Sequence, residues 1–360
     1  MALAIGIVGL PNVGKSTLFN ALLKKQAAFV ANFPFATIEP NVGIVPVPDK
    51  RLEVLADIVA GNPSTSLRTS RPPVVPATVR FVDIAGLVKG AAKGQGLGNK
   101  FLSHIREVDA ICEVVRHFKD KDVIHVGGEP NPESDKSIVN TELMLADLQT
   151  LEKQQGPKKI ASKDEIIRFS AIGKLKKTLD EGKLARECKL NDEEKILVKD
   201  LALLTFKPII YVANVDESDL KNNFGEDTIA ISAKIEQELS ELSESEQKEY
   251  LLELGLKEQG LERLVKKAYE TLNLISFLTA GEKEVRAWTI QKGMKAVEAA
   301  GVIHTDFIAN FIKAEAVFFD DFVQSGGWKR ARELGKARME GRDYIVKDGD
   351  VVEFKIGRSS

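Results

Sequence analysis

A glycine-rich run near the start of the chain carries residue types suited to hold phosphate. It reads Gly9-Leu-Pro-Asn-Val-Gly-Lys-Ser16 and lies between an apolar run and a helix-like stretch. Glycines allow backbone N–H groups to turn inward around phosphate oxygens, and a helix N-terminus favours negative charge. The Lys15 ammonium would reach the β- and γ-phosphates, and the Ser16 hydroxyl would ligate Mg²⁺. The predicted phosphate-binding residues are Asn12, Val13, Gly14, Lys15, Ser16 and Thr17.

Two further segments have residues that could read the γ-phosphate. Asp83 ends a strand-like run, where its carboxylate could hold Mg²⁺ through water while the Gly86 amide senses the phosphate. Thr37 lies in a proline-rich segment, and its hydroxyl could complete the magnesium shell or have no ligand role at all. The predicted catalytic residues are Lys15, Thr37 and Gly86, and the predicted magnesium ligands are Ser16, Thr37 and Asp83.

The elements that must position these residues follow an alternating pattern. Apolar runs alternate with amphipathic stretches, which is typical of helices covering a largely parallel sheet. The expected strands are Leu3–Val8, Thr78–Val82, Ala110–Val115, Pro208–Ala213 and Thr228–Ile231. The long gap before the last two strands predicts an insert in an α/β nucleotide-binding domain.

The insert and the C-terminal part have different patterns. In the insert, Ile172, Leu175 and Leu179 recur at helical spacing, and Asn191 with Glu194 resembles a capping box, so a helical hairpin is expected. Beyond residue 274 a strand-like run covers 286–290, and 344–355 is expected to form two strands around a Asp-Gly turn, giving a small α+β domain. The expected domains are 1–129 with 207–273, the insert 130–206, and 274–360.

Composition limits the class of protein. The 360 residues are 43% hydrophobic and 29% charged, with a formal net charge of -2, which indicates a globular chain of two or three domains. Any nucleic-acid contact must therefore be local. The two cysteines support neither a disulfide framework nor a zinc site. A membrane span needs roughly 20 apolar residues, and charged residues interrupt every apolar run before it reaches that length. We therefore expect a cytoplasmic protein that does not associate with a membrane.

Four motifs occur in the order found in translation-factor-class GTPases. The runs 9–16, 83–87, 214–217 and 232–234 resemble those motifs, and the chain more closely resembles the YchF/Obg-like ATPase family. The resemblance extends through 274–281, 284–288, 301–307, 326–328 and 343–350. It implies a C-terminal β-grasp domain of the TGS type and a Mg²⁺-dependent ATPase. It also implies binding to the ribosome, through its large subunit, with possible rRNA contact.

The base motif departs from the guanine-specific pattern Asn-Lys-x-Asp. Val215 and Glu217 replace the lysine and the aspartate, so the carboxylate that would accept the guanine N1–H and N2–H is displaced by one methylene. This weakens guanine recognition and predicts that ATP binds more tightly than GTP, with GTP preference as the nearest alternative. Asn214 would orient either the base or its loop. The predicted base-binding residues are Asn214, Val215, Glu217, Ser232 and Ala233.

No residue is assigned to activating water. Leu87 stands where many switch GTPases have a water-orienting glutamine, so intrinsic turnover is expected to be slow. By resemblance, Asn12 is a candidate ligand of a catalytic K⁺ ion, and a turn-capping role for it is equally open. Glu113 lies in the expected strand 110–115 and His117 follows that strand, and neither is assigned a catalytic part.

The sequence admits three functions. The first is a slow ATPase that acts as a conformational switch on the translation machinery. The second is a nucleotide-regulated adaptor in which hydrolysis is incidental. The third, a small-molecule kinase, is disfavoured because no arginine-rich lid is evident. A basic stretch between Trp328 and Arg338 could contact rRNA phosphates or form a solvated surface, because acidic residues interrupt it.

Overall fold

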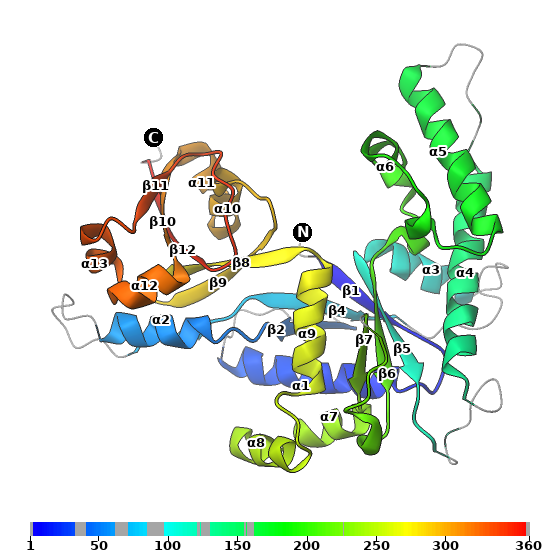
Figure 1. Ribbon diagram of the computed structural model, residues 1–360, viewed down its shortest axis with the longest axis horizontal. Helices are drawn as coiled ribbons and strands as arrows, with labels where there is room; N and C mark the ends of the chain where they lie inside the picture. Colours follow the sequence, from blue (N-terminus) through cyan, green and yellow to red (C-terminus); the bar gives the residue numbers. More distant parts are fainter. Residues whose placement is uncertain are drawn as a thin grey trace. The chain divides into compact units, whose positions relative to one another are not determined.

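The computed structural model describes residues 3–32, 41–61, 71–84, 97–120, 123, 130–154, 156, 162–225 and 227–357. The chain forms two compact units (Figure 1). The first comprises 1–45 and 80–264, and the second comprises 46–79 and 265–360.

The first unit is built on a six-stranded sheet with the order β2-β4-β1-β5-β6-β7. The strand pairs β1–β4, β1–β5, β5–β6 and β6–β7 are all parallel. Because parallel strands end at the same edge, the segments that follow them meet there, which is where ligands bind in such sheets. The strands are β1 Ala4–Val8, β2 Val42–Pro46, β4 Thr78–Asp83, β5 Ala110–Arg116, β6 Ile209–Asn214 and β7 Thr228–Ile231. The predicted α/β fold is confirmed.

Helices surround this sheet and form the insert. The insert has its own apolar core of α4, α5 and α6 side chains, including Leu151, Ile172 and Leu175, and α4 packs against β5 (Figure 1). The predicted helical hairpin is confirmed with a third short helix, and its Asn191–Glu194 capping box is present. The helices are α1 Lys15–Asn32, α3 Leu97–Glu107, α4 Pro132–Glu152, α5 Lys163–Asp180, α6 Asp192–Val198, α7 Ala233–Leu239, α8 Glu244–Glu253 and α9 Gly260–Thr271, which runs on into the second unit.

The second unit has a mixed sheet with the order β11-β10-β12-β8-β9-β3. The β8–β9 hairpin is antiparallel, and β12 returns parallel to β8 after intervening helices, which agrees with the predicted α+β class. The strands are β3 Val74–Val75, β8 Leu274–Ala280, β9 Val285–Gln291, β10 Phe311–Phe318, β11 Arg338–Glu340 and β12 Asp350–Ile356. The helices are α2 Arg51–Ala60, α10 Ala296–Ile303, α11 Asp306–Asn310, α12 Phe319–Ser325 and α13 Trp328–Glu333.

One strand expectation in this unit is wrong. The run 344–355 was expected to give two strands around the Asp348-Gly349 turn, but only β12 is a strand. Ile345 instead forms an isolated bridge with Lys295, and the Lys347 N–H donates to Asp350 Oδ2 at 3.0 Å. The backbone before β12 therefore forms a turn and a single bridge in place of a second strand.

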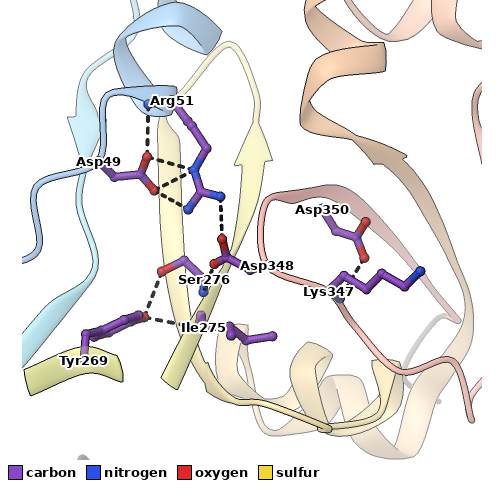
Figure 2. A network of polar contacts seen from close by, with 8 residues as sticks. All are labelled: Asp49, Arg51, Tyr269, Ile275, Ser276, Lys347, Asp348 and Asp350. Carbon is purple, nitrogen blue, oxygen red and sulfur yellow. Dashed lines mark hydrogen bonds and ion pairs between the residues drawn. The ribbon is translucent and has the colours of Figure 1, made fainter. Parts of the chain in front are cut away.

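The segment 46–79 also differs from the sequence prediction, which places it in the nucleotide-binding domain, because it packs in the second unit. β3 pairs with β9. Figure 2 shows Arg51 between two carboxylates: its Nη2 donates to Asp49 Oδ2 and its Nη1 to Asp348 Oδ2, each at 2.8 Å. Asp348 Oδ1 also accepts from the Ser276 N–H at 2.9 Å. The Arg51–Asp348 contact joins residues almost 300 positions apart, which no local sequence pattern can reveal.

Candidate nucleotide-binding site

Two glycines of the phosphate-binding loop occupy positions that exclude a side chain. Gly9 has φ +147°, and a Cβ there would lie 2.4 Å from the Val114 carbonyl oxygen. Gly14 has φ +98°, and its Cβ would lie 2.1 Å from Asn214 Nδ2. Both the backbone conformation and the space require glycine. Asn12 is also left-handed, with φ 61°, and is exposed.

Lys15 is the buried cation of this loop. Its Nζ donates to the Leu10 carbonyl oxygen at 2.6 Å, within its own loop. Burial lowers the pKa of Lys15 to about 8, although the nearby Asp83 charge acts in the opposite direction. A phosphate chain placed in the loop would supply the negative charge that a buried ammonium lacks.

The predicted magnesium ligands are placed in part. Ser16 is exposed in the first turn of α1, and Asp83 is the last residue of β4. Burial raises the pKa of the Asp83 carboxyl, and the Lys15 charge lowers it, so the two groups lie within electrostatic reach. A hard divalent cation fits this donor set, because hydroxyl and carboxylate oxygens are the ligands that Mg²⁺ prefers. Thr37 and Gly86 lie outside the described residues.

A cavity of about 900 Å³ lies beside the loop. Gly14 and Thr17 contribute to its lining. The five predicted base-binding residues also line it: Asn214, Val215, Glu217, Ser232 and Ala233. The structure therefore brings all five predicted base-site residues to one cavity. Within this group Glu217 is exposed, whereas the Val215 side chain is 2% exposed and packs in an apolar cluster with Leu220 and Ile235.

Asn214 connects three segments around the cavity. Its Nδ2 donates to the Val13 carbonyl oxygen at 2.8 Å, and its Oδ1 accepts from the Ala233 N–H at 3.0 Å. Its backbone carbonyl accepts from the N–H groups of His117 and Phe118, at 2.8 and 3.0 Å. Of the two roles considered for Asn214, this geometry favours orienting the loops.

Sequence reasoning missed the cavity wall that follows β5. Phe118, Lys119, Asp120 and Val123 line this side. The Lys119 N–H donates to Asp216 Oδ2 at 3.0 Å, which ties the wall to the loop after β6. The only available signal was an arginine and an aromatic residue just past a buried strand, and neither belongs to a known phosphate or base motif.

Glu113 has no direct part in this arrangement. It is 1% exposed in the middle of β5, and its Oε2 has no hydrogen-bond partner among the described residues. Burial raises the pKa of Glu113 to about 8, and its opposing charges are Lys136 and Arg186 of the insert. Burial also lowers the pKa of His117. Both groups face charges of the insert, so neither gains a water-activating role from this geometry.

Outside this site, the predicted basic stretch in the second unit is largely neutralised. Arg332 pairs with Glu315 and Glu353, and Lys336 lies 3.0 Å from Asp321. Arg338 contacts Asp350 at 3.4 Å. Across the described ranges, no helix is both long and apolar enough to cross a bilayer.

Comparison with known proteins identifies the family. A family model described as "50S ribosome-binding GTPase" matches residues 4–145. A second model, for the C-terminal domain of YchF GTPases and described as a protein of unknown function, matches residues 274–357.

Relatives match along nearly the full chain. "Ribosome-binding ATPase YchF" of Bacillus subtilis is 49% identical, covering 99% of this chain and 100% of its own. The protein of the same name from Escherichia coli O157:H7 is 48% identical, covering 98% and 99%. The solved structure of the Schizosaccharomyces pombe YchF GTPase is 37% identical, covers 98% of this chain and 97% of its own, and has a TM-score of 0.85. With this identity and coverage joined to the geometry of its phosphate loop, the chain belongs to the YchF family.

Proposed function

We propose that this protein is a ribosome-binding P-loop ATPase that acts as a slow nucleotide-dependent conformational switch. The observation that carries the proposal is the Asn214 linkage, which joins the phosphate loop to the wall of the neighbouring cavity. A triphosphate tail in the loop and a base in the cavity would thus be held by one connected frame. The names of the relatives support ATP hydrolysis and ribosome binding.

Hydrolysis by this site rests on charge and position. Lys15 would leave its loop carbonyl and bind the β- and γ-phosphates, where its charge offsets the charge of the transition state. Mg²⁺, held by Ser16 and Asp83 with Thr37 proposed to complete the shell, would supply further charge neutralisation. Leu87 cannot orient water through an amide, so slow turnover is part of the proposal. We also propose that a K⁺ ion bound at Asn12 increases the rate of hydrolysis. An equal rate in Na⁺ would reject this role.

ATP is proposed as the preferred nucleotide. Glu217 is exposed at the cavity and Val215 is buried in the apolar cluster, so neither reproduces the aspartate and lysine of guanine recognition. GTP remains a specific alternative, because the Schizosaccharomyces pombe structure and both family models carry the name GTPase. Titration of the magnesium-supplied protein with each purine triphosphate tests both, and equal or tighter GTP binding would overturn the ATP proposal.

Ribosome binding, through the large subunit, is proposed with a cytoplasmic location. The family model named for the 50S particle supports this choice of subunit. An rRNA contact through the second unit would rest on Lys329 and Arg330, which are exposed on α13, because the neighbouring basic side chains are paired with carboxylates. Co-sedimentation with separated subunits tests the proposal. Co-sedimentation with the small subunit alone would contradict it. Unchanged ribosome binding by a Lys329→Ala, Arg330→Ala double variant would reject the rRNA contact through these two residues.

A further inference from the structure

Arg116, the last residue of β5, is a buried arginine that binds backbone carbonyl groups. It is 1% exposed. Its Nη1 donates to the Val123 carbonyl and its Nη2 to the Asp120 carbonyl, both at 2.9 Å. Its Nε donates to the Phe118 carbonyl at 3.3 Å. The guanidinium thus gathers three carbonyl groups of the chain that follows it.

These carbonyl groups belong to residues that line the cavity. Phe118, Asp120 and Val123 all contribute to its wall. The planar guanidinium presents donors in fixed directions, so three carbonyls bound to it are held at fixed positions relative to one another. A lysine ammonium, or an apolar side chain of similar size, would not impose this arrangement.

The guanidinium also supports an aromatic ring. The Arg116 Cζ lies 4.4 Å from the centroid of the Phe118 ring, within the range of a cation–π contact. Phe118 is only partly buried, and it is the aromatic residue of the cavity lining. The Phe118 ring therefore contacts the guanidinium of Arg116, and Phe118 also borders the space in which a base would lie.

The same wall is also attached to β6 and to the loop that follows it. Arg116 is the register partner of Asn214 in the neighbouring strand β6. The Phe118 N–H donates to the Asn214 carbonyl at 3.0 Å, and the Lys119 N–H donates to Asp216. The position of Phe118 is thus set from its carbonyl side by Arg116 and from its N–H side by β6.

Arg116 has a structural role as well as a place beside the cavity. Burying a guanidinium costs free energy, which the three hydrogen bonds to carbonyl groups offset, so the residue also stabilises the segment that it binds. The charge is also unavailable to a nucleotide, because the side chain is almost completely covered and each of its three nitrogen atoms donates to a backbone carbonyl. What the residue supplies is order in the adjoining wall.

We propose that Arg116 is a positioning residue for the purine base: it preforms the wall carrying Phe118, against which the flat heteroaromatic ring stacks. This inference rests on the proposed nucleotide binding. Stacking depends on the π-face that every base has, so Arg116 contributes to affinity for ATP and GTP alike and does not contribute to affinity for the phosphate chain.

The test compares Arg116→Lys with the wild type in Mg²⁺-containing titrations of ATP, GTP and inorganic tripolyphosphate, which has no base. We expect ATP and GTP affinity to fall by the same factor, roughly tenfold, with tripolyphosphate affinity unchanged. Arg168→Lys is the matched control, because Arg168 binds the Leu197 carbonyl and Asp200 in the insert. All three affinities should stay at wild-type values in this control.

The outcomes separate this inference from the proposed function. Absence of ATP binding by the wild type would reject the proposed function itself. Wild-type ATP binding with unchanged affinity in Arg116→Lys would reject the positioning role alone. An equal loss for ATP and tripolyphosphate would also reject it, because that pattern indicates general damage to the fold.

A second variant keeps the inference testable if Arg116→Lys is unstable by circular dichroism. Phe118→Leu removes the ring but keeps the carbonyl groups that Arg116 binds. We expect the same base-dependent loss, again without a change for tripolyphosphate. If both variants fold, the double variant should lose less than the product of the two single effects, because the residues act together. Fully multiplicative effects, or an unchanged Phe118→Leu, would overturn the proposal.

Discussion

The side chain of Asn214 donates a hydrogen bond to the backbone carbonyl of Val13 at 2.8 Å, across 201 positions of the sequence. The same amide accepts from the Ala233 N–H, so the phosphate loop and the segment after β7 share one side chain. The close approach leaves no space for a Cβ on Gly14. The phosphate loop therefore depends on a residue from the base motif for its shape.

Replacing Asn214 with alanine tests this dependence. Asn214→Ala leaves the Val13 carbonyl and the Ala233 N–H without their partner, at about 1 kcal/mol or more for each lost bond. We expect ATP and GTP affinity to fall together, by roughly 10- to 100-fold, as measured by calorimetric titration. Asn222→Ala, at an exposed asparagine outside the cavity lining, is the control. A selective loss of one nucleotide would instead indicate direct base recognition by Asn214.

Shortening Glu217 tests the origin of the nucleotide preference. Glu217→Asp restores the carboxylate position of the guanine motif, so the GTP affinity should rise several-fold relative to the ATP affinity. Competitive titration of the two nucleotides measures this change. Glu217→Gln, which keeps the length and removes the charge, should not improve GTP binding. An unchanged ratio in Glu217→Asp would show that the nucleotide preference lies elsewhere in the cavity.

Glu113 should make stability depend on pH. Its pKa is raised from 4.5 to about 8 by burial, so between these values the folded protein binds more protons than the unfolded chain. Stability contributed by the protonated group is present at low pH and is lost as pH rises toward 8. In Glu113→Gln this slope should be smaller, by up to about 1.4 kcal/mol per pH unit.

Urea unfolding at pH 5.5, 6.5 and 7.5 measures that slope. Glu249→Gln, at an exposed glutamate of α8, is the control and should keep the wild-type slope. If Glu113→Gln follows the wild type across this range, Glu113 is ionised in the folded protein and the assignment is wrong.

Arg51 should stabilise the second unit. Arg51→Met removes the contacts with Asp49 and Asp348 (Figure 2), and we expect a loss of about 1–3 kcal/mol, reduced toward the lower value by the exposure of Asp348. Both tryptophans, Trp288 and Trp328, lie in this unit, so intrinsic fluorescence reports its unfolding.

Lys295→Met is the matched control for Arg51→Met, because it removes the exposed Lys295–Asp343 pair. It should leave the fluorescence midpoint almost unchanged, because solvent screens the attraction between two exposed charges. Equal fluorescence midpoints for the Arg51→Met variant and the wild type would show that the 46–79 segment is held by its other contacts, such as the β3–β9 pairing, and not by Arg51.

The sequence by itself determined the phosphate loop, the α/β class, the helical insert and the family resemblance. These features are readable because they depend on local requirements: glycine where backbone N–H groups turn inward, apolar residues at strand or helix period, and caps such as Asn191. The residues of the base motif were also readable, since their order along the chain is part of the pattern.

Only the tertiary structure decided which groups act on one another. Arg116 and Phe118 have no motif, and their role depends on backbone carbonyls that turn back onto a buried guanidinium. The 46–79 segment contacts the rest of the second unit through the β3–β9 pairing and through Arg51 and Asp348, which lie 297 positions apart in the sequence. Hydrophobic periodicity specifies which face of an element is buried, but it does not specify the partner, because many apolar faces are chemically equivalent until the chain is folded.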